Sequence, residues 1–123
     1  MYSTNFTAGL GLTTMLENYG YAPVSSGTLH PADLTEAMYS SIMAYAEPSA
    51  DLTAWSKNVL DTVWKGAWGD HSHYFWDTEV ARYMLDEMAE ILDNLAPEGF
   101  YFGASEGDAA DFAIWPIAEE EAV

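Results

Sequence analysis

The segment "DTEVARYMLDEMAEILDN", residues 77–94, has the periodicity that most restricts how this chain can fold. At about 100° per residue, the apolar side chains of this segment and its C-terminal flank fall on one side of a helix. They are Val80, Met84, Met88, Ile91, Leu92 and Leu95. The opposite side carries a stripe of acids: Glu79, Asp86, Glu90 and Asp93. We therefore predict an amphipathic helix with a buried apolar face and an acidic outer face.

Turn signals predict further helices in the N-terminal half. A helix over residues 30–47 is expected to begin with Pro31 at its first position and to stop before Pro48. Several glycines punctuate the segment before it, which leaves room for a short helix around residues 12–19. The run "PVSSG", residues 23–27, reads as a loop.

Capping signals mark two later helices. Ser49 offers an N-cap for a helix over residues 50–64. Five apolar side chains recur there at helical spacing: Leu52, Trp55, Val59, Leu60 and Val63. Residues 65–76 break that period and are predicted to form a structured connection. Asp77 is the expected cap of the acidic helix.

The C-terminal part predicts the only strands. Pro97 and Gly99 stop the acidic helix, and two aromatic-rich runs follow, separated by the turn-rich "SEGDAA". We expect an α+β fold that is mostly helical, with three to four helices and a C-terminal β-hairpin. The expected organisation is a single domain over residues 1–123, with a mobile acidic tail at about 118–123.

Composition limits the class of protein. Half of the residues are apolar and 15% are aromatic, which is enough for one core and too much for a disordered acidic chain. No apolar run approaches the roughly 20 residues of a membrane-spanning helix, and the N-terminus lacks the basic start of a signal peptide. The chain has no cysteine for disulfides or thiolate metal sites. We expect a cytoplasmic protein whose Trp and Tyr side chains are mainly core.

Charge is the most unusual property of the chain. Twenty acidic residues face only Lys57, Lys65 and Arg82, for a formal net charge of −17. Thirteen of the acids fall in residues 77–123. Direct binding to nucleic acid is not expected, because phosphate affinity depends on Lys and Arg. The charge predicts a basic partner instead.

One short cluster could suggest a metal site. Imidazoles and carboxylates at close spacing can bind a divalent ion, and the cluster comprises Asp70, His71, His73, Asp77 and Glu79. The spacing matches no metal motif such as HExxH, so structural or surface roles are the favoured interpretation and no metal is expected. Likewise "SEGDAAD" does not have the spacing of a calcium loop.

The sequence contains no recognisable catalytic or cofactor motif. "GLG" at residues 9–11 lacks the third glycine of a dinucleotide fingerprint, and no GxxxxGK[ST] is present. No GxSxG occurs, and nothing selects one pair of carboxylates for acid–base chemistry. We expect no cofactor and no enzymatic activity.

The segment "PEGFYFGASEGDAADFAIWP", residues 97–116, resembles the C-terminal signature of small acidic proteins of phages and mobile elements. The resemblance covers about a sixth of the chain. The matching positions are Tyr101, Phe102, Gly103, Ala104, Gly107, Asp108, Ala110, Asp111, Phe112 and Trp115. The chain departs from the pattern, where His, Pro and Gly are usual, at Ser105, Glu106, Ala109 and Ala113.

In size and charge the chain also resembles DNA mimics, which block restriction or CRISPR complexes with carboxylates placed where phosphates are expected. That resemblance implies a non-enzymatic anti-CRISPR or anti-restriction protein acting in the host cytoplasm. The predicted partner-binding residues are Glu79, Asp86, Glu90, Asp93, Asp70, Asp77, Glu106, Asp108 and Asp111. Three alternatives remain: a salt-adapted halophilic protein, a phage structural or assembly protein with a basic partner, and, last, a small enzyme or metal protein.

Overall fold

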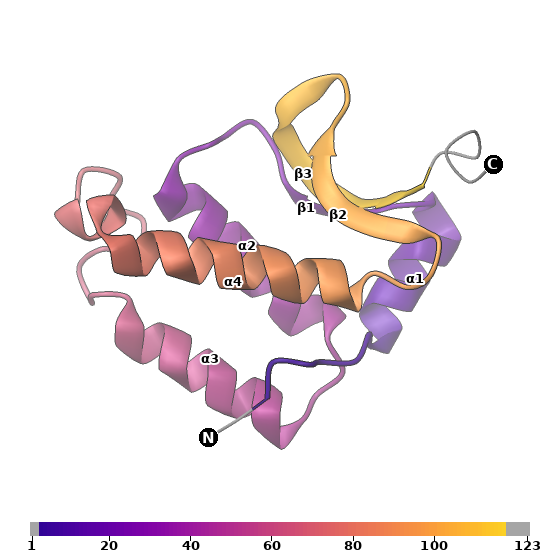
Figure 1. Ribbon diagram of the computed structural model, residues 1–123, viewed down its shortest axis with the longest axis horizontal. Coiled ribbons are helices and arrows are strands. Elements are labelled where there is room, and N and C mark those ends of the chain that lie inside the picture. The colour runs from indigo at the N-terminus through magenta and orange to yellow at the C-terminus, as the bar shows by residue number, and fades with distance from the viewer. Residues whose placement is uncertain (1–2, 118–123) are drawn as a thin grey trace.

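The computed structural model describes residues 3–117 (Figure 1). Its elements, in chain order, are α1 (Leu10–Tyr19), β1 (Ala22–Ser25), α2 (Pro31–Tyr45), α3 (Ala50–Thr62), the 3-10 helix η1 (Tyr74–Asp77), α4 (Glu79–Leu95), β2 (Phe100–Ser105) and β3 (Asp108–Pro116). This confirms the predicted α+β fold, mostly helical with a C-terminal hairpin. The tail predicted at 118–123 lies outside the described residues.

The three strands form one antiparallel sheet in the order β1-β3-β2. β2 and β3 are the predicted hairpin, in which Phe102 lies opposite Ile114. The prediction of a loop at residues 23–27 is wrong for its first part, because Ala22 and Pro23 pair with β3 across from Ile114 and Ala113. Proline is compatible with β1 because β1 is an edge strand, where one side needs no ladder hydrogen bonds. Such a distant pairing has no local sequence signal.

The helices enclose one hydrophobic cluster beside this sheet. α4 packs along α2, and α2 also contacts β1. Figure 1 shows α4 in front of α2, with α3 along the lower edge and the hairpin along the upper edge. The largest fully buried side chains are Trp55, Phe75, Leu12, Ile42, Met88, Ile91, Leu92, Ile114, Val59 and Thr35. Of the helices in the described residues, none is both long and apolar enough to cross a bilayer.

The cap of α4 differs from the prediction. Thr78 Oγ1 accepts a hydrogen bond from the Ala81 N–H at 3.3 Å and also donates one to the Phe75 carbonyl at 2.7 Å. Thr78 therefore caps α4, and the prediction of Asp77 is wrong. Asp77 is the last residue of η1, whereas Thr78 has the extended backbone, φ −84° and ψ 159°, that an N-cap requires. Because the 3-10 helix η1 includes Asp77, the N-cap of α4 is the next residue, Thr78.

The other helix starts follow the sequence signals more closely. Ser49 Oγ accepts a hydrogen bond from the Leu52 N–H at 3.0 Å, which confirms the predicted cap of α3. Pro31 stands at the first position of α2, as predicted. His30 supplies an unpredicted cap there, because its Nδ1 accepts a hydrogen bond from the Ala32 N–H at 3.0 Å.

Two side chains predicted on apolar faces are not buried. Leu60 is 51% exposed and Val80 is 50% exposed. Both lie at the margin of their helix's apolar arc, and the neighbouring Val59 and Ala81 occupy the core instead. The helical period therefore gave the direction of each buried face but not its width.

The glycines near the N-terminus allow close packing between α1 and α2. A Cβ on Gly11 would lie 2.7 Å from the Ala44 carbonyl oxygen, and one on Gly9 would lie 3.0 Å from the Glu47 amide nitrogen. Real Cβ atoms do not approach backbone so closely, so a side chain at Gly11 would force the two helices apart. This packing accounts for "GLG" without a nucleotide.

Candidate partner-binding surface

The outer face of α4 carries a row of exposed carboxylates. We call Glu79, Asp86, Glu90 and Asp93 the α4 stripe; all four are exposed, opposite the buried face of the helix. Glu79, Asp86 and Glu90 have no side-chain hydrogen bond or ion pair to any described residue. Over residues 3–117, the only ion pair within 4.0 Å joins His71 and Asp33. No ion pair within 4.0 Å therefore neutralises the stripe within the described residues, and Arg82 lies one helical turn from both Glu79 and Asp86.

Asp93 differs from the other members of the stripe. Its Oδ1 accepts a hydrogen bond from the Phe102 N–H at 3.1 Å, which ties the end of α4 to β2. A helical wheel cannot detect this contact, because the wheel describes α4 alone and Phe102 belongs to β2. Glu87, which the sequence did not single out, accepts a hydrogen bond from the Trp55 indole N–H at 2.9 Å. Asp93 and Glu87 therefore have structural contacts as well as charge.

The two loop acids lie beside the N-terminal end of α4. Asp70 Oδ1 accepts hydrogen bonds from the Ser72 hydroxyl at 2.8 Å and from the Ser72 N–H at 3.1 Å. The hydroxyl contact, followed by the backbone contact, lowers the pKa of Asp70 below its ordinary value. Asp77 is exposed and shares a small cavity with Arg82, but the two side chains do not form an ion pair. Asp77 precedes Glu79 by two residues, and Asp70 belongs to the connection before α4.

The hairpin acids lie elsewhere. Glu106 is exposed in the β2–β3 turn, and Asp108 Oδ1 accepts a hydrogen bond from the Ala110 N–H at 2.9 Å. Asp111 is half-buried beside Tyr21 and Trp115, whose rings stack at 5.2 Å. Figure 1 shows this turn at the upper edge of the molecule and the connection before α4 at the left edge. Of the nine predicted residues, six therefore lie on α4 or in the segment before it, and three lie on the hairpin. Asp93 connects the two groups through its hydrogen bond from the Phe102 N–H.

The histidines of the possible metal cluster have structural contacts instead. His71 Nε2 lies 2.7 Å from Asp33 Oδ1, and the His71 ring stacks on His30 at 4.4 Å. His73 Nδ1 accepts a hydrogen bond from the Phe75 N–H at 3.0 Å and so caps η1. Within residues 3–117, no three side chains of metal-binding type converge as ligands would. These contacts support structural roles for His71 and His73.

Aromatic side chains are more exposed than predicted. Trp55 and Trp76 are buried, as expected for core residues, but Trp64, Tyr74 and Tyr83 are exposed. Trp64 packs edge-on against Tyr74, with ring centroids 4.9 Å apart. The chain thus offers aromatic as well as acidic surface, and composition alone could not separate buried from exposed rings.

Comparison with protein-family models, curated proteins and solved structures found no match to this chain. The functional argument therefore depends on charge, geometry and the contacts described above.

Proposed function

We propose that this protein is a non-enzymatic inhibitor of a host defence complex, of anti-CRISPR or anti-restriction type, that presents carboxylates in place of nucleic-acid phosphates. The observation that carries this proposal is the α4 stripe, in which Glu79, Asp86 and Glu90 are exposed and have no hydrogen-bond or ion-pair partner among residues 3–117. A net charge of −17 destabilises a folded chain through self-repulsion. A basic partner would remove that repulsion on binding.

The spacing of the charges supports a phosphate-like surface only if several elements contribute. With a rise of 1.5 Å per residue, Glu79, Asp86 and Asp93 succeed one another at about 10 Å along α4. Duplex DNA carries one charge per about 1.7 Å of axis, so α4 alone is too sparse. Asp70 and Asp77, beside the start of α4, increase the charge density at one end. We place the centre of the mimicking surface there.

The partner would be a basic nucleic-acid channel. Complementary charge speeds encounter, and close charge pairs in such interfaces can each contribute a few kcal/mol. With three basic residues in the whole chain, the protein would compete with nucleic acid rather than bind it. Its site of action would be the host cytoplasm.

Salt adaptation is the alternative that a specific observation favours. Exposed acids that accept no hydrogen bond from the part of the chain that the structure describes also occur on α1, α2 and α3, at Glu17, Glu36 and Asp61. A salt-adapted chain would need about 1 M salt to fold, because only screening would offset its self-repulsion. We expect cooperative unfolding at about 0.15 M salt instead. A chain that is unfolded there and folds near 1 M would favour salt adaptation.

Two charge variants test the proposal. The stripe reversal spares Asp93 because of its hydrogen bond and comprises Glu79→Lys, Asp86→Lys and Glu90→Lys. The off-stripe reversal makes the same change in net charge at exposed acids of other elements, and it comprises Glu17→Lys, Glu47→Lys and Asp61→Lys. Both should fold, since none of these side chains is buried or hydrogen-bonded within the described residues.

The assay is displacement of labelled DNA or guide RNA from purified restriction and CRISPR complexes. The parent should displace nucleic acid from its target at about one protein per binding site, since a blocking inhibitor is consumed stoichiometrically and an enzyme is not. The stripe reversal should lose at least about tenfold in affinity, and the off-stripe reversal much less. If the stripe reversal inhibits as well as the parent, or if the target keeps its nucleic acid while inhibited, mimicry by this surface is wrong.

A further inference from the structure

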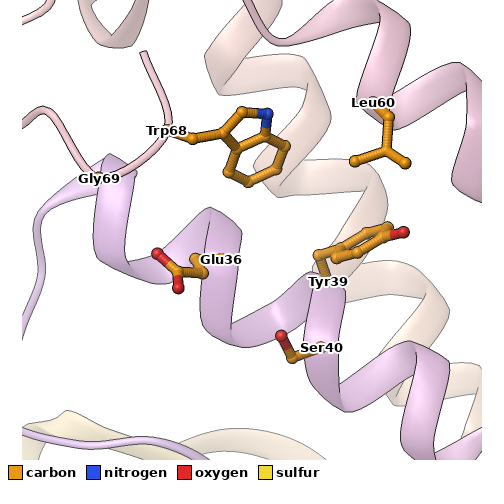
Figure 2. Close-up of a pocket in the computed structure, with 6 residues that line it drawn as sticks. All are labelled: Glu36, Tyr39, Ser40, Leu60, Trp68 and Gly69. Atoms are coloured by element: carbon orange, nitrogen blue, oxygen red, sulfur yellow. The ribbon is translucent and has the colours of Figure 1, made fainter. Parts of the chain in front are cut away.

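An open cavity of about 470 Å³, with wide access to solvent, lies at the surface between α2, α3 and the connection that follows α3. Figure 2 shows the residues that line it: Glu36, Tyr39, Ser40, Leu60, Trp68 and Gly69. The rings of Tyr39 and Trp68 form two of its walls, with centroids 6.2 Å apart and planes inclined at 54°. Leu60, which the helical period placed in the core, is instead exposed beside them.

The walls of this cavity are held in place by contacts behind them. The Tyr39 hydroxyl is 2.5 Å from the Ser56 hydroxyl on α3, and the Tyr39 ring packs against Trp55 at 5.8 Å. Trp68 meets the buried Trp76 edge-on at 6.4 Å. Two aromatic surfaces are therefore ordered before any ligand arrives, which lowers the entropy cost of binding.

The chemistry of the lining selects a cation. Glu36 is exposed, has no hydrogen-bond or ion-pair partner among the described residues, and is the only charged side chain in the lining. Aromatic faces attract cations through the ring quadrupole, and more strongly where water is partly excluded. An anion would meet the carboxylate and the negative ring faces and would be repelled.

Among organic cations the geometry favours a guanidinium group. A guanidinium is planar, so it can stack on a Trp or Tyr ring while its N–H groups reach a carboxylate in a bidentate pair. An ammonium group is a compact, hydrated point charge with no planar face to stack on Tyr39 or Trp68. We propose that this cavity binds an arginine side chain of the basic partner, stacked on Trp68 or Tyr39 and paired with Glu36.

The cavity is separate from the α4 stripe. The residues that line the cavity come from α2, α3 and the connection after α3, and none of them belongs to α4. The cavity and the α4 stripe are therefore built from different elements. The inference rests on the proposed function only in requiring a basic partner, and the two surfaces can be tested independently.

The test is a titration with the blocked peptide Gly-Arg-Gly, followed by the NMR resonance of the Trp68 indole N–H. Binding should be saturable and should move this resonance. Gly-citrulline-Gly keeps the shape of arginine without its charge, and Gly-Lys-Gly keeps the charge without the planar group; both should bind at least several-fold more weakly. No shift at Trp68, or equal binding of either control peptide, would overturn the arginine assignment.

Protein variants give the second arm. Glu36→Gln should weaken arginine binding roughly tenfold or more, because it removes the charge-assisted hydrogen bonds. Glu17→Gln removes the same charge from α1 and should change binding less than about twofold at about 0.15 M salt. Circular dichroism should show both variants folded, since both side chains are exposed. Equal binding by Glu36→Gln and the parent would contradict the proposal.

The stripe reversal separates this inference from the proposed function. It should still bind Gly-Arg-Gly while failing to displace nucleic acid from the target. Loss of peptide binding in that variant would contradict the separation of the two surfaces. If the parent displaces nucleic acid but does not bind the peptide, the cavity proposal is wrong and the inhibitor proposal stands.

Discussion

α4 and the connection that precedes it, residues 63–78, meet at Thr78. They differ in whether their polar side chains form hydrogen bonds within the protein. On α4, the side chains of Glu79, Asp86 and Glu90 are exposed and contact no hydrogen-bond or ion-pair partner within the described range 3–117. In the connection, the Trp76 indole donates hydrogen bonds to two carbonyl oxygens, each at 3.0 Å, and Asp70 accepts two from Ser72. A regular helix satisfies its own backbone, so its outer side chains remain free for a partner. An irregular segment needs its side chains to satisfy its backbone.

The largest expected effect is a loss of unfolding free energy. It tests whether the connection contributes as much to stability as the buried face of α4. Trp76→Ala should lower the free energy of unfolding by about 3–5 kcal/mol, because it removes a buried ring and the donor to the carbonyls of Ala67 and Asp70. Met88→Ala, in the buried face of α4, should cost about 2–5 kcal/mol. Urea unfolding followed by circular dichroism measures both. A cost below about 1 kcal/mol for Trp76→Ala would mean that the connection contributes little to the fold.

The next largest loss of stability is expected at Thr78, where the connection ends and α4 begins. Thr78→Ala should cost about 1 kcal/mol, since Thr78 accepts the capping hydrogen bond from Ala81. Asp77→Ala should change stability by less than about 0.5 kcal/mol, because Asp77 is exposed and does not cap α4. The same urea titration compares them. If Asp77→Ala proves the more costly of the two, Asp77 rather than Thr78 is the effective cap.

The same contrast explains what the sequence could predict. The 3.6-residue period identified the buried face of α4, including Met84, Met88 and Ile91, because burial repeats with the helix. No period describes the connection, where His73 caps η1 and Trp76 bonds to carbonyls six and nine residues earlier. These contacts follow from the path of the chain, which local spacing does not encode.

The candidate surfaces divide in the same way. The exposed acids of the α4 stripe could be identified from the wheel alone. Asp93 could not be separated from them, because its partner Phe102 belongs to another element. The cavity at Glu36, Tyr39 and Trp68 was missed entirely, since it requires α2 and the connection to lie together.

Within α4 itself, Asp93 and Asp86 make a pair that should differ. Asp93→Ala should lower the free energy of unfolding by about 0.5–1.5 kcal/mol through loss of the hydrogen bond from the Phe102 N–H. Asp86→Ala removes the same charge from the same helix face and should stay within about 0.5 kcal/mol of the parent. Thermal or urea unfolding of both variants decides this. Equal stabilities would mean that Asp93 is as free for a partner as Asp86.

The smallest expected effect concerns the contact between the connection and α2. The Thr28 hydroxyl donates a hydrogen bond to Asp33 Oδ2 at 2.6 Å, and His71 Nε2 lies 2.7 Å from Oδ1. The Thr28 contact, followed by the His71 contact, lowers the pKa of Asp33 below 3.8. A carboxyl with a lowered folded pKa stabilises the protein above its unfolded pKa. That stabilisation is lost as pH falls through the folded value, because the unfolded state then binds more protons.

The overall charge acts in the opposite direction, so the measurement must be a difference. Protonating an excess of acids relieves self-repulsion and tends to stabilise the folded chain as pH falls. Asp61→Asn removes one exposed carboxylate that has no hydrogen-bond partner among the described residues. It has the same net charge as Asp33→Asn, so the effect of overall self-repulsion is the same in both variants. As pH falls below about 4, the ordinary range of an Asp carboxyl, the stability advantage of Asp61→Asn over Asp33→Asn should shrink as Asp33 is protonated. Urea midpoints at several pH values give this difference. A difference that stays constant across the interval would show that the contact of Asp33 with Thr28 and His71 does not stabilise its charged form.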